Sequence, residues 1–230
     1  MRKLIISLAF LPLISLANEG VIGVTAPIDA TDYASLQRGA RTFVNSCLNC
    51  HSANYMRYNR LQEIGLTEKQ IKDNLLFAGE KVGDTMRVAM NPKDAKKWFG
   101  VAPPDLSVEV RARGADWVYA YLQGFYRDET TPTGWNNVVY DKVAMPHVLY
   151  ELQGEQVLNH ETHQLELVKP GRMSPSEYNA FIGDLTNYMA WMAEPAKQER
   201  KHIGIWALLF LGVLLVLAIK LKKEYWKDIK

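Results

Sequence analysis

The stretch CLNCH, residues 47–51, contains both cysteines of this 230-residue chain. Two residues separate the thiols of Cys47 and Cys50, and His51 follows directly. Three kinds of site use a C-x-x-C spacing: a zinc site, a dithiol redox pair and a covalently attached c-type haem. The surrounding sequence decides among these three chemistries.

Covalent haem attachment is the chemistry that uses all three residues of the motif. Each thiol adds to one vinyl group of the porphyrin, and the histidine ligates the iron. Zinc needs four ligands, yet no second cysteine pair exists, and His160 and His163 do not complete a zinc pattern. A redox dithiol normally opens a helix in a βαβ context, which is missing here. We therefore expect one haem c bound through Cys47 and Cys50, with His51 on the iron.

The N-terminal stretch indicates export. Residues 1–17 read MRKLIISLAFLPLISLA, with Arg2 and Lys3 ahead of an apolar run. Residues 15–17 (SLA) form a small-x-small cleavage site, so we predict a signal peptide and a mature chain that starts at Asn18. An uncleaved anchor is the alternative, and it also exports the residues that follow.

A second apolar run lies near the C-terminus. IGIWALLFLGVLLVLAI, residues 203–219, contains no charge, and at about 1.5 Å per residue it reaches roughly 26 Å, near the lower limit for a membrane span. Five lysines follow it, which is typical of the cytoplasmic side. We predict a transmembrane helix at 203–220, a cytoplasmic basic tail at 221–230 and a periplasmic domain at 18–202. A buried core helix is the alternative.

The exported segment 18–202 is mildly acidic, with a net charge of −3 against +2 for the whole chain. Within residues 141–166 the only basic residue is Lys142, while the segment 151–166 holds four glutamates. An ordinary solvated loop explains this pattern. The functional alternative is docking of a basic soluble partner, because charge raises the encounter rate. No basic stripe favours nucleic acid.

Apolar spacing and capping residues indicate three helices in this domain. Residues 33–47 have helix-like spacing and run into the CLNCH motif. TEKQ at 67–70 is a capping box for a helix to about residue 77. SPSE at 174–177 is a stronger box with proline at the first helical position, and the apolar stripe behind it predicts a core helix that ends or bends at Pro195.

Two long stretches, 79–107 and 127–172, are rich in proline, glycine and asparagine. Bare loops of that length are uncommon in compact domains, and a large buried porphyrin would give them an apolar centre. A short hairpin is predicted within residues 147–168.

A haem that only transfers electrons needs a second axial ligand, and methionine in that position raises the reduction potential. Met145 lies in VAMPH, where Pro146 stiffens the backbone and helps to hold a weak thioether ligand. We favour Met145, with Met86 or Met90 and then His147 as alternatives. Each methionine could also be plain core filler.

Four segments in order resemble the cytochrome c1 family, the haem subunit of the ubiquinol–cytochrome c reductase (bc1) complex. They are the haem-motif region at 36–61, APPDLS at 102–107 with RAR at 111–113, VAMP at 143–146, and the link at 188–204. The resemblance covers almost the whole mature chain, whose brevity is similar to that of the compact bacterial versions.

The resemblance implies a mainly α, class I-like cytochrome c domain with long loops around one covalent haem, plus a single C-terminal transmembrane helix. It implies that Met145 ligates the iron opposite His51. Arg113 would pair with a haem propionate, and Pro104 would pack on the porphyrin.

The implied function is electron transfer from a Rieske iron–sulfur protein to soluble cytochrome c, in a dimeric complex with cytochrome b in the bacterial inner membrane. The lipid bilayer is then a further partner, and catalysis belongs to the whole complex. One alternative is an autonomous membrane-anchored mono-haem electron carrier without stable partners. Another is a catalytic haem protein whose open sixth site binds peroxide or a gas.

Overall fold

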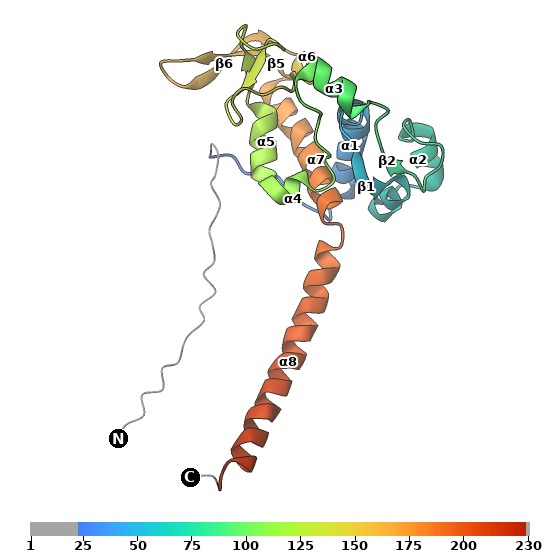
Figure 1. Ribbon diagram of the computed structural model, residues 1–230, viewed down its shortest axis with the longest axis vertical. Coiled ribbons are helices and arrows are strands. Elements are labelled where there is room, and N and C mark those ends of the chain that lie inside the picture. The colour runs from blue at the N-terminus through green and yellow to red at the C-terminus, as the bar shows by residue number, and fades with distance from the viewer. Residues whose placement is uncertain (1–22, 229–230) are drawn as a thin grey trace.

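The computed structural model describes residues 23–228, so the predicted signal peptide lies outside the described residues. The expectation of a mainly α fold is confirmed, and Figure 1 shows α1, α5 and α7 together in one head, from which α8 leaves as a separate rod. The elements in chain order are α1 Tyr33–Thr42, η2 Phe43–Cys47, β1 Ala53–Arg57, η3 Tyr58–Ile64, α2 Glu68–Asn74, β2 Thr85–Met86, α3 Pro92–Phe99, α4 Glu109–Arg113, α5 Ala115–Gln123, β3 Phe125–Arg127, β4 Trp135–Asn137, α6 Tyr150–Gln153, β5 Gly154–Asn159, β6 Gln164–Pro170, α7 Pro175–Ala193 and α8 Lys197–Tyr225.

Helices α1 and α7 pack against each other at the centre of the head. A Cβ added to Gly39 would lie 2.1 Å from the Asp184 carbonyl oxygen and 2.6 Å from Cβ of Tyr188, so the close approach requires glycine. Arg38 donates to both carboxylate oxygens of Asp184, at 2.6 and 2.9 Å. The ring centroids of Phe43 and Tyr188 are 5.6 Å apart in the same helix contact. The packing fixes the helix that leads into the CLNCH turn.

Both predicted capping boxes are confirmed. The side chains of Thr67 and Ser174 accept hydrogen bonds from the backbone three residues further on, and the side chains of Gln70 and Glu177 accept from the capping residue in return. The predicted break at Pro195 is also confirmed, because that residue lies between the end of α7 and the start of α8.

The two stretches expected to be long loops contain more regular structure than we predicted. Segment 79–107 holds β2, which pairs with β1, and α3, which Asn91 caps by accepting from the N–H of Lys93. Segment 127–172 holds β4, paired with β3, and the antiparallel β5–β6 hairpin. The hairpin expected within 147–168 is therefore confirmed, although its second strand extends to Pro170.

Helix α8 carries the second apolar run. It is 29 residues long and its apolar side chains are exposed, so by length and composition it is long and apolar enough to cross a membrane. A buried core helix, the alternative considered from the sequence, is wrong, because these side chains pack on nothing in the described head. The predicted limits of 203–220 lie inside the helix and stay a prediction.

Candidate haem site

An apolar cavity of about 360 Å³ lies beside the CLNCH turn. Its walls come from that turn, the APPDLS segment, α4, α5, α7 and the loop that carries Met145. The volume falls in the range of small-molecule and cofactor sites. Cys47, Cys50, His51, Pro104, Arg113 and Met145 all line this cavity. The structure thus brings together the six residues of the favoured haem site, whereas the alternative sixth ligands are not among the lining residues.

The CLNCH turn is shaped by the π-helix η2, which the sequence analysis did not predict. The N–H of Leu48 donates to the carbonyl of Phe43 at 3.0 Å, five residues back. The N–H groups of Cys50 and His51 then both donate to the Cys47 carbonyl, at 3.0 and 2.9 Å. Single π turns are rare in proteins overall, and those that occur are often found at functional sites. This turn places both thiols and the imidazole at the same wall.

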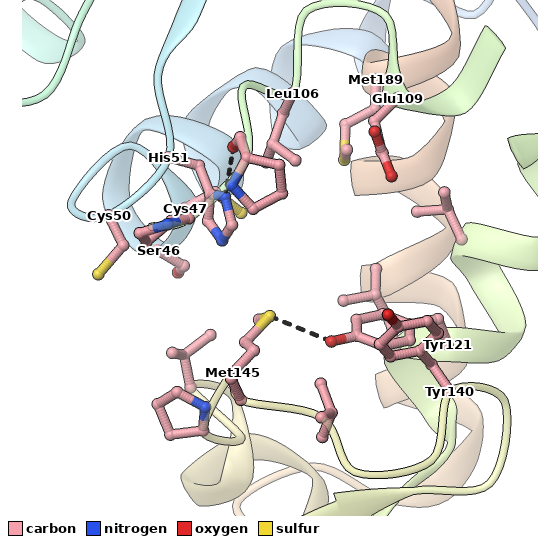
Figure 2. A pocket seen from close by; sticks show the side chains of 18 of the residues that line it. Ser46, Cys47, Cys50, His51, Leu106, Glu109, Tyr121, Tyr140, Met145 and Met189 are labelled. Atoms are coloured by element: carbon pink, nitrogen blue, oxygen red, sulfur yellow. Dashed lines mark hydrogen bonds between the residues drawn. The ribbon is translucent and has the colours of Figure 1, made fainter. Parts of the chain in front are cut away.

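The imidazole of His51 is held by a backbone oxygen distant in the sequence. Its Nδ1 lies 2.8 Å from the carbonyl oxygen of Pro104, which can only accept, so Nδ1 carries the proton. Nε2 is then free as an acceptor, and Figure 2 shows the ring turned toward the open space. Burial lowers the pKa of His51 and thereby favours the neutral imidazole that binds metals.

Hydrogen bonds fasten the APPDLS segment to the residues that follow the motif. The backbone N–H and side-chain amide of Asn54 donate to one carboxylate oxygen of Asp105, at 2.8 and 2.7 Å. The N–H of Leu106 donates to the carbonyl of Ser52 at 2.8 Å. These contacts hold the Pro104 carbonyl at hydrogen-bonding distance from His51.

The two thiols are in surroundings that suppress thiolate formation. Burial, with a contribution from neighbouring Cys50, raises the pKa of Cys47 to about 12, and burial also raises the pKa of Cys50. A redox dithiol works through an accessible thiolate of lowered pKa. The environment therefore disfavours the dithiol alternative.

Met145 lies on the wall opposite the CLNCH turn. Figure 2 shows the Met145 sulfur and the His51 ring facing one another across the cavity. The hydroxyl of Tyr121 donates to the Met145 sulfur at 3.4 Å. Burial raises the pKa of Tyr121, so the phenol keeps its proton at physiological pH.

The alternative sixth ligands lie elsewhere. Met86 is fully buried in β2, and neither it nor Met90 is among the residues that line the cavity. His147 stacks on Phe125 with ring centroids 4.7 Å apart, outside the lining. Burial lowers the pKa of His147 to about 4, so it is a neutral core ring. Met189, which lies on the apolar stripe predicted behind the SPSE box, also lines the cavity and is labelled in Figure 2.

Arg113 is the only lysine or arginine that lines the cavity in the described chain. Its guanidinium lies 4.4 Å from the ring centroid of Trp117 and 5.7 Å from that of Tyr140. Glu109, one turn earlier on α4, forms an ion pair with it. The stacking holds the cation at the cavity wall. An anionic group of a bound cofactor could there replace Glu109 as the partner of the guanidinium, or share the guanidinium with Glu109.

Asn136 is a structural residue of the site that the sequence analysis missed. It is 5% exposed, and its oxygen accepts from the N–H groups of Asn137 and Lys142, both at 2.9 Å. Its amide donates to Asp128 at 3.0 Å and to Asp141 at 2.9 Å. These bonds tie β4 to the turn that leads into Met145. The stretch WNNVVYD offers no local pattern that reveals this role.

The acidic segment 151–166 is partly neutralised within the fold. Glu155 pairs with Arg127 at 2.8 Å and with Lys169 at 3.0 Å, and these partners lower its pKa to about 2. Glu151 lies 3.5 Å from Arg172. Docking of a basic partner on this segment stays a prediction, which now depends mainly on Glu161 and Glu166.

The CLNCH turn, the oriented neutral histidine and the methionine across an apolar cavity define a mono-haem c-type cytochrome. The chain belongs to the Cytochrome C1 family, whose model matches residues 23–229.

Several known proteins are similar to this chain. The cytochrome c1 of Allochromatium vinosum is 48% identical over 100% of both chains. A Nitrosomonas europaea protein named ammonia monooxygenase gamma subunit is 55% identical, over 89% of this chain and 87% of its own. The mitochondrial cytochrome c1 heme protein of Saccharomyces cerevisiae is 26% identical, over 89% and 70%. A solved chain titled Hyperthermophilic respiratory Complex III is 18% identical, with a TM-score of 0.43 over 85% and 77%.

Family membership defines the cofactor and the assembly. The chain binds covalent haem c and is the membrane-anchored electron-transfer subunit of the bc1 complex, with cytochrome b and the Rieske protein as partner subunits. The alternative of an autonomous electron carrier is thereby set aside.

Proposed function

We propose that Cys47 and Cys50 attach the haem, with His51 and Met145 as the two iron ligands. The observation that carries this proposal is the placement of His51 and Met145 on facing walls of one apolar cavity. The hydrogen bond from His51 to Pro104 supports it, because that bond leaves Nε2 for the metal. When bound, the haem supplies a one-electron iron couple.

The chain's own residues orient the ligands, exclude water and balance charge. The apolar lining keeps water from the metal, which with a thioether ligand favours a high reduction potential. Arg113, stacked on Trp117, is the cation proposed to pair with a propionate. Pro104 is proposed to pack on the porphyrin and, through its carbonyl, to keep His51 in the required tautomer.

In this proposal the electron comes from the Rieske protein and leaves to soluble cytochrome c. The haem domain, residues 18–202, lies in the periplasm after removal of residues 1–17. Residues 203–220 cross the inner membrane and 221–230 form the cytoplasmic tail. The lysines behind the apolar run support this orientation.

The proposed sixth ligand is tested by replacing Met145 with alanine. We expect that reduced wild-type protein does not bind carbon monoxide, since both axial positions are filled, and that Met145→Ala binds it readily. The readout is the visible spectrum after addition of carbon monoxide. Met90→Ala, a half-buried methionine outside the cavity lining, is the matched control and should behave like wild type.

Either of two results would contradict the assignment. The first is carbon monoxide binding by the reduced wild type, which would indicate the open sixth site of a catalytic haem protein. The second is an unchanged spectrum in Met145→Ala. A shift in Met189→Ala instead would move the ligand to the other methionine that lines the cavity.

The printed name of the Nitrosomonas europaea relative gives a second candidate assembly, an ammonia monooxygenase. Purification in mild detergent distinguishes the two, followed by mass spectrometry of the accompanying polypeptides. The bc1 assembly predicts cytochrome b and a Rieske protein in stoichiometric amounts. Co-purification with ammonia monooxygenase subunits in their place would favour the second assembly.

A further inference from the structure

Tyr121 is the one side chain in the described chain that donates a hydrogen bond to the proposed sixth ligand. Its hydroxyl lies 3.4 Å from the sulfur of Met145, a contact that joins α5 to the loop across 24 residues of sequence. Figure 2 draws this bond at the wall of the cavity, with the Met145 sulfur between the Tyr121 hydroxyl and the His51 ring.

The ring of Tyr121 has little freedom to move away from the sulfur. It stacks on Trp117 with centroids 5.2 Å apart and an interplanar angle of 9°. The rings of Tyr121 and Phe125 form a T-shaped pair, with centroids 5.1 Å apart and an interplanar angle of 70°. The Tyr121 carbonyl accepts from the Asn137 side-chain amide at 2.8 Å, which fixes the end of α5. The hydroxyl is therefore held in place by packing on two sides and by its own backbone.

We propose that Tyr121 is a positioning residue for Met145, and that its hydroxyl raises the reduction potential of the bound haem. This inference rests on the proposed ligation by Met145. A thioether sulfur has two lone pairs, so one can accept a hydrogen bond from the hydroxyl while the other remains for a metal. The bond also holds the flexible Met145 side chain in one rotamer.

The direction of the effect follows from charge. The positive end of the O–H dipole faces the sulfur and draws electron density away from it. When the sulfur donates less electron density, oxidised iron loses more stabilisation than reduced iron does, because oxidised iron carries one more positive charge. The reduction potential therefore rises. Hydrogen bonds around axial ligands are among the means by which proteins adjust haem potentials. Loss of the hydroxyl should therefore favour the oxidised form.

The test is Tyr121→Phe in the full-length protein within its complex. Phenylalanine keeps the ring contacts with Trp117 and Phe125 and removes only the hydroxyl. We expect the equilibrium between reduced and oxidised haem c to shift two- to tenfold toward the oxidised form, where tenfold corresponds to 59 mV for one electron. The readout is the midpoint potential from a spectroelectrochemical titration.

Tyr119→Phe is the matched control. Tyr119 lies on the same helix, does not line the cavity, and donates to the carbonyl of Asn179 at 3.3 Å. Its replacement should leave the midpoint potential at the wild-type value. As a second measurement, 3-fluorotyrosine at position 121 is a stronger donor of nearly the same shape and should shift the potential upward.

The outcomes separate this inference from the proposed function. If Met145→Ala opens the haem to carbon monoxide but Tyr121→Phe keeps the wild-type potential, the inference is wrong and the ligand assignment stands. An equal shift in Tyr119→Phe would also overturn it, because the effect would then be general to α5. If Met145→Ala stays closed to carbon monoxide, the ligand assignment and this inference both fail.

Discussion

At the scale of single residues, the orientation of His51 depends on a hydrogen bond to a backbone carbonyl of the APPDLS segment. C-x-x-C-H is a local pattern, so the sequence alone is enough to propose Cys47, Cys50 and His51 as haem-binding residues. The partner of His51 is the carbonyl of Pro104, 53 residues away, and a backbone oxygen leaves no mark in a sequence. Met145 was favoured because Pro146 follows it, whereas its contact with Tyr121 depends on how α5 folds back toward the loop.

Asn136 provides a test at the same scale. Asn136→Ala removes the acceptor shared by two backbone N–H groups and leaves them unpaired near the core, at a cost of about 1–3 kcal/mol. We expect a lower thermal midpoint and partial opening of the reduced haem to carbon monoxide, because the loop of Met145 loosens. Differential scanning calorimetry and the carbon monoxide spectrum measure the two effects.

The control for this substitution is Asn74→Ala. Asn74 is exposed, and its amide only donates to the Gln70 carbonyl within α2. If the two variants lost the same stability and neither bound carbon monoxide, Asn136 would have no special role in holding the ligand loop.

At the scale of elements, local signals decided which helices could be predicted. The boxes at Thr67 and Ser174 are complete within four residues, so they were visible. Helix α4 has no side-chain cap, and its five residues depend on packing against α5 and α7. Helix α3 did carry a signal, because Asn91 and Pro92 are a cap and a first-turn proline. This pair is a local signal for a helix inside the stretch 79–107, which was expected to be a loop.

The packing of α1 on α7 predicts that any side chain added at Gly39 strongly destabilises the fold. Gly39→Ala places a methyl group 2.1 Å from a backbone oxygen of α7, which cannot move alone. We expect a loss of about 3 kcal/mol or more in stability, or failure to assemble, measured by chemical denaturation. Gly83→Ala meets nothing within 4 Å and should stay close to wild type. Equal stability of the two variants would contradict the proposed helix packing.

The β5–β6 hairpin predicts an acid-sensitive element. Its Glu155 has a folded pKa lowered to about 2 by Arg127 and then Lys169, against an ordinary value of 4.5. A lowered carboxyl pKa contributes stability that is fully present above pH 4.5 and is lost as the pH falls toward 2. Hydrogen exchange of the hairpin amides should therefore accelerate over that window in wild type. In Glu155→Gln the acceleration should be absent, and identical pH profiles would contradict this account.

At the scale of the whole molecule, the order of four segments along the chain indicated the family more specifically than any single segment did. The haem motif, APPDLS, VAMP and the apolar terminal run together indicated the family, which the match over residues 23–229 confirms. The cavity that unites them could not be predicted, because it forms where the segment that contains Pro104, the loop of Met145 and three helices meet. Contacts over such distances depend on packing rather than on local pattern.

Anchoring is the other property of the whole molecule. Figure 1 shows α8 leaving the head at the end opposite the β5–β6 hairpin. With the helix in a bilayer, the head is held at the membrane surface. The chain's contribution is thus a tethered haem domain whose own side chains bind and orient the haem.

The most direct test of the central claim is one reduced-minus-oxidised visible spectrum of the full-length protein, purified in mild detergent from its own membranes. A haem c subunit of a bc1 complex predicts a c-type band together with the b-type bands of cytochrome b. A c-type band alone would contradict the assembly. No c-type band at all would contradict haem attachment at CLNCH.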